Sequence, residues 1–190
     1  FTASYTQEYD YLTDDNEGDG YFLTSGLRLG TSYDTGWELP VMGELKYSPS
    51  LFTNVSYKLG DEISTDRRGI EPGFRHSLSG GDRDWIGNFR EGLIGTISNS
   101  NSINLNDGSL NRNFSAELKG YLELDPFGLS GRGLIELSLD DGDYANASPI
   151  RGILDDRFEG DAGAYFNSDV TLKVWTIGNF VEGQGSFFFD

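Results

Sequence analysis

The sequence predicts an all-β protein built from antiparallel strands. Three segments, 21–33, 114–124 and 129–139, alternate between apolar and polar side chains, which is the period of a strand with two different faces. The 190 residues include 26 Gly and 14% aromatic residues but only one Met and 5 Pro, a composition typical of strands and turns. This length suits a single domain covering residues 1–190.

Each of these segments separates aliphatic from charged side chains. In segment 114–124, Leu118 and Leu122 share one face, while Glu117 and Lys119 share the other. Segment 129–139 repeats the design, with its Leu and Ile residues set against Arg132 and Glu136. Segment 21–33 and segment 37–47 continue it toward the N-terminus.

Turn residues predict where these strands reverse. Asp125-Pro126-Phe127-Gly128 is expected to join segments 114–124 and 129–139, and Tyr33-Asp34-Thr35-Gly36-Trp37 to join segments 21–33 and 37–47. A further hairpin is predicted to turn at Arg90-Glu91-Gly92. Stretches rich in Asp, Asn, Ser and Gly predict long polar loops at about 60–82, 98–110 and 140–160.

Charge and residue usage exclude several classes of function. Fourteen basic against 31 acidic residues give a net charge of −17, which argues against a nucleic-acid partner because phosphates are bound by clustered Lys and Arg. Without Cys, the chain has no disulfide, thiol nucleophile or Cys-ligated zinc. The single His, His76, falls in a predicted loop and is expected to be exposed, with no nucleophile motif around it. We therefore predict neither an enzyme nor a bound cofactor.

Two architectures fit strands with one aliphatic and one charged face. In a transmembrane antiparallel β-barrel, the aliphatic face meets lipid and the charged face lines a wet lumen. The aromatic residues Tyr33, Trp37, Tyr47 and Trp85 would then lie near the membrane interfaces. In an antiparallel β-sandwich, the aliphatic faces are sealed between two layers. That alternative predicts a secreted or cell-surface structural or carbohydrate-binding module.

Three stretches resemble, in the same order, hairpins of the general porins of the Gram-negative outer membrane. Segment 27–39 is similar to an Arg-Leu-Gly strand followed by an acidic, glycine-containing turn. Segment 85–97 is similar to the next hairpin of that family. Segment 113–131 resembles the hairpin that follows the pore-constricting third loop. The resemblance covers roughly residues 1–140 and favours the porin-like transmembrane β-barrel.

The resemblance implies a channel for passive diffusion of small hydrophilic solutes across a bilayer of lipid and lipopolysaccharide, assembled as a homotrimer. The surplus of acidic residues favours cations. Arg28 falls on the family's strand arginine that lines the pore constriction, and Arg83 lies one residue from another such position. The third-loop candidate, 98–112, contains Asp107 and Arg112. Alternation adds six further lumen candidates: Glu44, Lys46, Glu117, Lys119, Arg132 and Glu136.

The expected number of strands differs from that of the family. General porins close with about 16 strands, whereas about eight to ten are expected here. The chain is therefore predicted to be either part of a larger barrel or a smaller relative.

An acidic run offers a candidate calcium site. Asp14, Asn16 and Asp19 belong to the run Asp14-Asp15-Asn16-Glu17-Gly18-Asp19-Gly20, and hard cations bind clustered carboxylates. Ser25 stands where an EF-hand places its bidentate Glu, so a solvated turn is the alternative.

Overall fold

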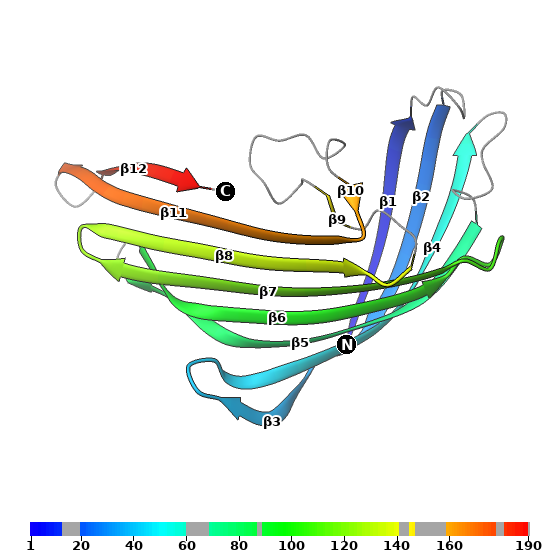
Figure 1. Cartoon of the computed structure of the whole chain (residues 1–190), viewed down its shortest axis with the longest axis horizontal. Helices are drawn as coiled ribbons and strands as arrows, with labels where there is room; N and C mark the ends of the chain where they lie inside the picture. Colours follow the sequence, from blue (N-terminus) through cyan, green and yellow to red (C-terminus); the bar gives the residue numbers. More distant parts are fainter. Residues whose placement is uncertain are drawn as a thin grey trace. The chain divides into compact units, whose positions relative to one another are not determined.

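The computed structural model confirms an antiparallel all-β fold. It describes residues 1–12, 20–59, 69–86, 89–140, 145–146, 159–177 and 181–189 (Figure 1). In this part of the chain, no helix is long and apolar enough to cross a membrane. The strands are β1 (Thr2–Leu12), β2 (Gly20–Gly30), β3 (Tyr33–Leu39), β4 (Gly43–Leu59), β5 (Gly69–Ile86), β6 (Phe89–Ile103), β7 (Leu110–Leu124), β8 (Phe127–Ser138), β9 (Ala145–Asn146), β10 (Glu159–Gly160), β11 (Ala162–Ile177) and β12 (Val181–Phe189).

Ten strands form one sheet. Its order is β1-β2-β4-β5-β6-β7-β8-β11-β12, with β3 paired to β4 outside this path, and β9 and β10 form a separate pair. Figure 1 shows β5, β6, β7 and β8 running side by side. Over the described residues the sheet is not closed, because β1 and β12 at the two ends of this order do not pair with each other. Closure into a barrel therefore stays a prediction.

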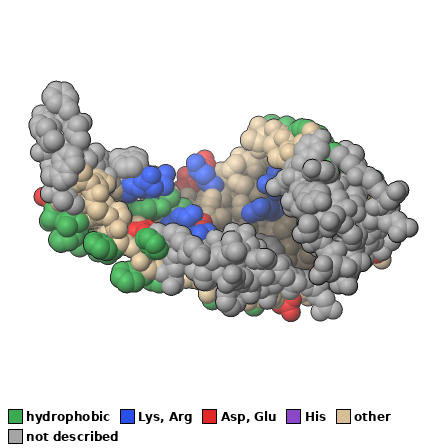
Figure 2. Space-filling model, turned by 90° about the horizontal axis from the view of Figure 1, so that it is seen from above, with side chains coloured by type: hydrophobic (Ala, Val, Ile, Leu, Met, Phe, Trp, Pro, Cys, Tyr) green, Lys and Arg blue, Asp and Glu red, His purple; other side chains and the backbone are tan. Residues whose placement is uncertain are grey.

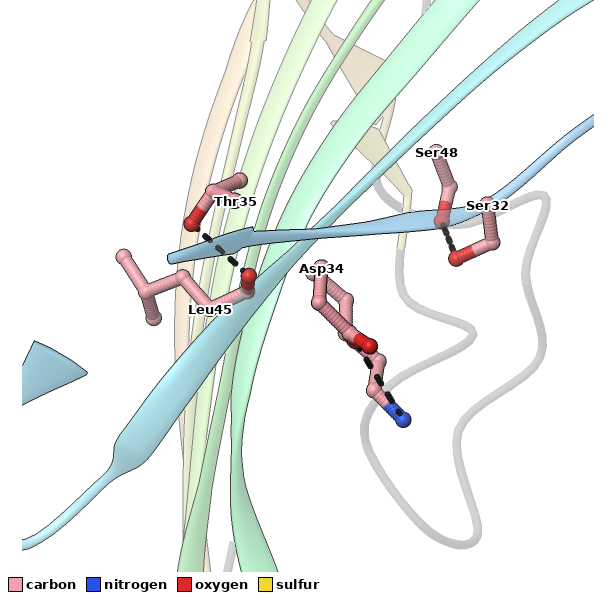
Figure 3. A network of polar contacts seen from close by, with 6 residues as sticks. Ser32, Asp34, Thr35, Leu45 and Ser48 are labelled. Carbon is pink, nitrogen blue, oxygen red and sulfur yellow. Dashed lines mark hydrogen bonds and ion pairs between the residues drawn. The ribbon is translucent and has the colours of Figure 1, made fainter. Parts of the chain in front are cut away.

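The turn predicted at residues 33–37 is wrong. These residues belong to β3, and the chain reverses between β3 and β4, at residues 40–42. The Thr35 hydroxyl donates to the Leu45 carbonyl at 2.8 Å and holds β3 against β4 (Figure 3). Gly36 lies inside β3 with a φ of 72°, a conformation that glycine adopts readily. Pro40 ends the strand because it has no amide hydrogen to donate to the ladder.

The hairpin turn at Asp125-Pro126 is confirmed, because β7 ends at Leu124 and β8 begins at Phe127. The turn predicted at residues 90–92 is wrong, since β6 already begins at Phe89. Gly92 lies inside β6 with a φ of 135°, a conformation that only glycine adopts readily.

Two predicted loops are shorter than expected. In the range 60–82, strand β5 begins at Gly69, and in the range 98–110, β6 continues to Ile103. The Asn and Ser residues of 98–103 are compatible with a strand because they bond across the ladder. The hydroxyls of Ser98 and Ser115 lie 2.8 Å apart, and the Asn99 amide donates to the Asn113 carbonyl at 3.1 Å. Most of the predicted loop 140–160 lies outside the described residues.

The described chain divides into two compact units. Unit 1 comprises Phe1–Tyr33, Tyr47–Ser77 and Asn99–Asn113, and unit 2 comprises Asp34–Lys46, Leu78–Ser98 and Phe114–Asp190. The single domain expected over residues 1–190 stays a prediction.

The aliphatic strand faces are largely uncovered. In unit 2, Leu118, Leu122 and Ile135 are 49%, 45% and 48% exposed. Leu45 and Leu134 are buried, and no described side chain in either unit is completely buried. The β-sandwich alternative requires these aliphatic side chains to be sealed between two layers, and that seal is not observed at Leu118, Leu122 or Ile135.

Candidate functional site

The opposite face of the same strands carries the charges. Strands β8 and β11 pair with Arg132 opposite Asn167, Leu134 opposite Tyr165 and Glu136 opposite Gly163. We call this side of unit 2 the polar face; it comprises Glu117, Lys119, Tyr121, Glu123, Ser130, Arg132, Leu134, Glu136, Tyr165, Asn167 and Asp169. The apolar face is the other side of these strands and of β6; it comprises Leu93, Gly95, Ile97, Ala116, Leu118, Gly120, Leu122, Gly131, Gly133, Ile135, Ala164 and Phe166.

An ion network joins β7 and β8 on the polar face. Arg132 Nε donates to Glu117 Oε1 at 2.6 Å, and Lys119 Nζ lies 2.8 Å from Glu117 Oε2. Each carboxylate oxygen of Glu117 therefore has its own cation. The three side chains are only partly exposed, so their attraction is less screened than that of a surface pair.

Further polar groups extend this network along the strands. Glu136 lies four residues after Arg132 and so projects to the same side of β8. The Ser130 hydroxyl donates to Asp169 Oδ2 at 3.2 Å and links β8 to β11. Figure 2 shows basic and acidic side chains lying close together on one face of the molecule. Fixed charges of both signs at the same surface can orient polar solutes and ions without covalent chemistry.

Two arginines converge on one aromatic ring. The guanidinium carbons of Arg83 and Arg90 lie 5.8 Å and 5.9 Å from the centre of the Tyr121 ring, within the range of cation–π contact. The sequence placed Arg83 among the constriction candidates but missed Arg90 and Tyr121. The position of Tyr121, two residues after Lys119 on the same face of β7, was the signal that could have found it.

The remaining strand arginine among the predictions, Arg28, belongs to unit 1. Its guanidinium carbon lies 5.9 Å from the centre of the Phe52 ring. The Phe52 ring fills the space over Gly73, where a Cβ would collide with it. Glycine at position 73 therefore lets the aromatic ring that contacts Arg28 lie flat on the sheet.

Lys46 and Glu44 are not part of the ion network around Glu117. Lys46 Nζ lies 3.9 Å from Asp34 Oδ1, and both side chains are mostly exposed. Figure 3 shows this ion pair at Asp34 and, separately, the hydrogen bond that the Ser48 hydroxyl donates to the Ser32 hydroxyl at 2.9 Å. Glu44 is exposed at the beginning of β4. An ion pair of this kind contributes little to stability, about 0–1 kcal/mol.

The structure does not support Asp107 and Arg112 as residues of a long infolded loop. Asp107 lies in the short turn of residues 104–109, and its carboxylate accepts the Ser109 amide at 2.7 Å. That hydrogen bond lowers the pKa of the exposed Asp107 carboxyl below its usual value. Arg112 lies on β7, five residues before Glu117, so alternation directs it to the opposite face.

The calcium candidates Asp14, Asn16 and Asp19 lie outside the described residues. Within the described ranges, no group of three or more His, Asp or Glu side chains is arranged to hold a metal ion. The expectations of no cofactor and no catalysis stay predictions.

His76 differs from its prediction as an exposed loop residue. It lies on β5, where its Nδ1 is 3.2 Å from the Tyr47 hydroxyl and its ring stacks on Phe74. Tyr33 packs edge-on against Tyr47, with ring centres 5.5 Å apart. These four rings form an aromatic cluster within unit 1.

No protein-family model matches this sequence, and no curated protein matches it either.

Proposed function

We propose that this chain forms a porin-like channel in a bacterial outer membrane, through which small hydrophilic solutes and ions diffuse passively. The observation that carries the proposal is the opposition of the two faces in unit 2. The polar face holds the Glu117–Arg132–Lys119 network, whereas Leu118, Leu122 and Ile135 on the apolar face are about half exposed.

Physical chemistry favours a membrane for such a sheet. Exposed aliphatic side chains on one continuous face are costly in water, where burial stabilises by about 25 cal/mol per Å² of apolar area. In a bilayer the same face contacts hydrocarbon, and the charged face lines water. Closure, by a longer chain or by assembly with further copies, would pair the outer strand edges. Homotrimers and contact with lipopolysaccharide belong to the same proposal.

The charge balance sets the expected ion selectivity. The chain carries a net charge of −17, so the entrances of the proposed channel should favour cations. The polar face holds Lys119 and Arg132 together with four acidic residues, and Arg83 and Arg90 contact its Tyr121 ring. The charge at this face is therefore nearly balanced. We therefore expect a modest preference for cations.

The test is the reversal potential of single channels in planar bilayers under a KCl gradient. Arg28→Glu replaces a positive by a negative charge on the strand face of unit 1 and should move the reversal potential further toward cation selectivity. Arg132→Gln removes a positive charge from the polar face of unit 2 and should move it in the same direction by a smaller amount.

Arg112→Glu provides the matched control, because Arg112 projects from β7 to the side opposite Glu117. Its reversal potential should remain within error of the unmodified protein. An absence of conductance in the unmodified chain, or equal shifts in all three variants, would contradict the proposal.

A further inference from the structure

A hollow lies on the apolar face of unit 2. It has a volume of about 540 Å³ and is bounded on one side by Leu39, Met42 and Leu45, around the turn between β3 and β4. The sheet beneath it consists of small residues on four strands: Gly95, Ala116, Gly133 and Ala164. Small side chains flanked by larger ones leave a trough in the sheet surface.

The β3–β4 turn is fixed where it borders the hollow. The Gly81 amide donates to the Met42 carbonyl at 2.7 Å, and the Met42 amide donates to the Leu39 carbonyl at 3.2 Å. The Met42 side chain lies over Gly95, where a Cβ would collide with its terminal methyl group. The turn is therefore held against the sheet at Gly81 and Gly95, and the hollow beside it is part of the folded structure.

The surface of the hollow is almost entirely hydrocarbon. Ile97, Leu118 and Ile135 form its other sides, and the polar ends of neighbouring strand residues point to the polar face. An apolar cavity of about 150 Å³ stays free of water and binds a molecule as small as benzene. A hollow more than three times as large, open along the sheet, suits an extended hydrocarbon chain.

We propose that this hollow binds one acyl chain of a bilayer phospholipid. The proposal rests on the membrane location given above. The hollow opens on the apolar face, and Leu118 and Ile135 in its lining are about half exposed. In the proposed orientation this face is covered by lipid, so acyl chains are the hydrocarbon present there at high concentration. The hollow would hold one phospholipid longer than the surrounding lipids.

The test reduces the volume of the hollow by enlarging a residue of the sheet that forms its floor. Gly133 lies in the floor of the hollow, and a Cβ at this position meets no atom of the described chain within 4 Å, so the side chain of Gly133→Leu can enter the hollow without a clash at its Cβ. Gly131→Leu is the matched control. Gly131 lies two residues earlier on the same face of β8, outside this hollow, and its Cβ would be 3.9 Å from the nearest atom.

Each protein is folded into vesicles of palmitoyl-oleoyl phosphatidylethanolamine and phosphatidylglycerol, extracted into mild detergent, and examined by native mass spectrometry. The unmodified chain and Gly131→Leu should retain one phospholipid. Gly133→Leu should retain it at least tenfold less often. Ala164→Leu, which fills the same hollow from β11, gives the same comparison if Gly133→Leu does not fold.

Equal retention by all variants would show unspecific lipid and overturn the proposal, as would no retention by the unmodified chain. A dimer that disappears in Gly133→Leu would assign the hollow to a second copy of the chain and also overturn it. Conductance, measured on the same samples, separates this proposal from the channel. A conducting protein without retained lipid refutes only the acyl-chain site, whereas lipid retention without conductance refutes only the channel.

Discussion

The two faces of unit 2 differ in the contacts that their side chains make. On the polar face, Glu117 is bonded to Arg132 and Lys119 at 2.6 Å and 2.8 Å, and Ser130 reaches Asp169 across the strands. On the apolar face, Leu118 and Ile135 are half exposed and the small residues between them leave a hollow. A soluble sheet covers its aliphatic face and leaves its charges to solvent. This contrast is the basis of the proposed membrane location, in which the apolar face meets lipid and the polar face meets water.

The largest expected effect comes from a charge on the apolar face. Leu118→Lys lies at the middle of β7 and should destabilise the protein by about 2–4 kcal/mol in phosphatidylcholine vesicles, because a cation at the bilayer midplane is poorly solvated. Equilibrium unfolding in urea measures it. Leu105→Lys, an exposed residue of the 104–109 turn, is the control and should change the free energy of unfolding by less than about 0.5 kcal/mol. Equal losses of unfolding free energy in Leu118→Lys and Leu105→Lys would contradict the proposal that the apolar face lies in lipid.

Replacement by alanine should change the free energy of unfolding in opposite directions at Gly73 in unit 1 and at Gly133 on the apolar face of unit 2. Gly73→Ala in unit 1 forces the Phe52 ring to move and should cost about 1–3 kcal/mol. Gly133→Ala on the apolar face meets open space and should be neutral or stabilising by up to about 1 kcal/mol, since alanine loses less backbone entropy than glycine. Denaturant midpoints of the two variants provide the measurement. A destabilising Gly133→Ala would mean that the hollow is already closed.

Loss of the carboxylate at the centre of the ion network should have an intermediate effect. Glu117→Gln leaves Arg132 and Lys119 without their shared counter-charge and should cost about 1–2 kcal/mol. This is the lower end of the range of about 1.5–3 kcal/mol for hydrogen bonds to charged groups, because the three side chains are partly exposed. Glu123→Gln, on the same face of β7, is the control and should cost less than about 0.5 kcal/mol. If both variants behave alike, the network does not stabilise the polar face.

The smallest effect concerns the 104–109 turn. The pKa of Asp107 is lowered because its carboxylate accepts the Ser109 amide. A lowered pKa in the folded state stabilises above the unfolded pKa of about 3.9, and this contribution disappears as the pH falls through the folded value. Hydrogen exchange at the Ser109 amide, corrected for its intrinsic pH dependence, should become faster in acid. Asp107→Asn should reduce that response, and an unchanged response would exclude the carboxylate as its cause.

Much of the strand pattern could be predicted from the sequence. The alternation in segments 114–124 and 129–139 and the Asp125-Pro126 turn are local features, and the structure brings Glu117, Lys119 and Arg132 together as alternation requires. Polar strands could not be recognised in this way. Residues 98–103 look like a loop because their Asn and Ser side chains find partners only after β7 lies beside β6.

Other parts of the candidate site depend on contacts between distant segments. The contact between Arg90 on β6 and the Tyr121 ring on β7 is not predicted by any local sequence motif. The β3–β4 turn depends on Pro40 and on the fit of Met42 over Gly95, 53 positions further along the chain. Pro40 was the available local signal for the turn, because proline seldom occupies the interior of a strand.

The most direct test of the central claim uses the absence of Cys in this chain. Single cysteines at positions 116–124 of β7 are labelled with an environment-sensitive fluorophore in phosphatidylcholine vesicles. Quenching by spin-labelled lipid should peak at Leu118, Gly120 and Leu122. Quenching by aqueous iodide should peak at Glu117, Lys119 and Tyr121. This account predicts two opposite patterns with a period of two residues, and iodide access to every position would contradict it.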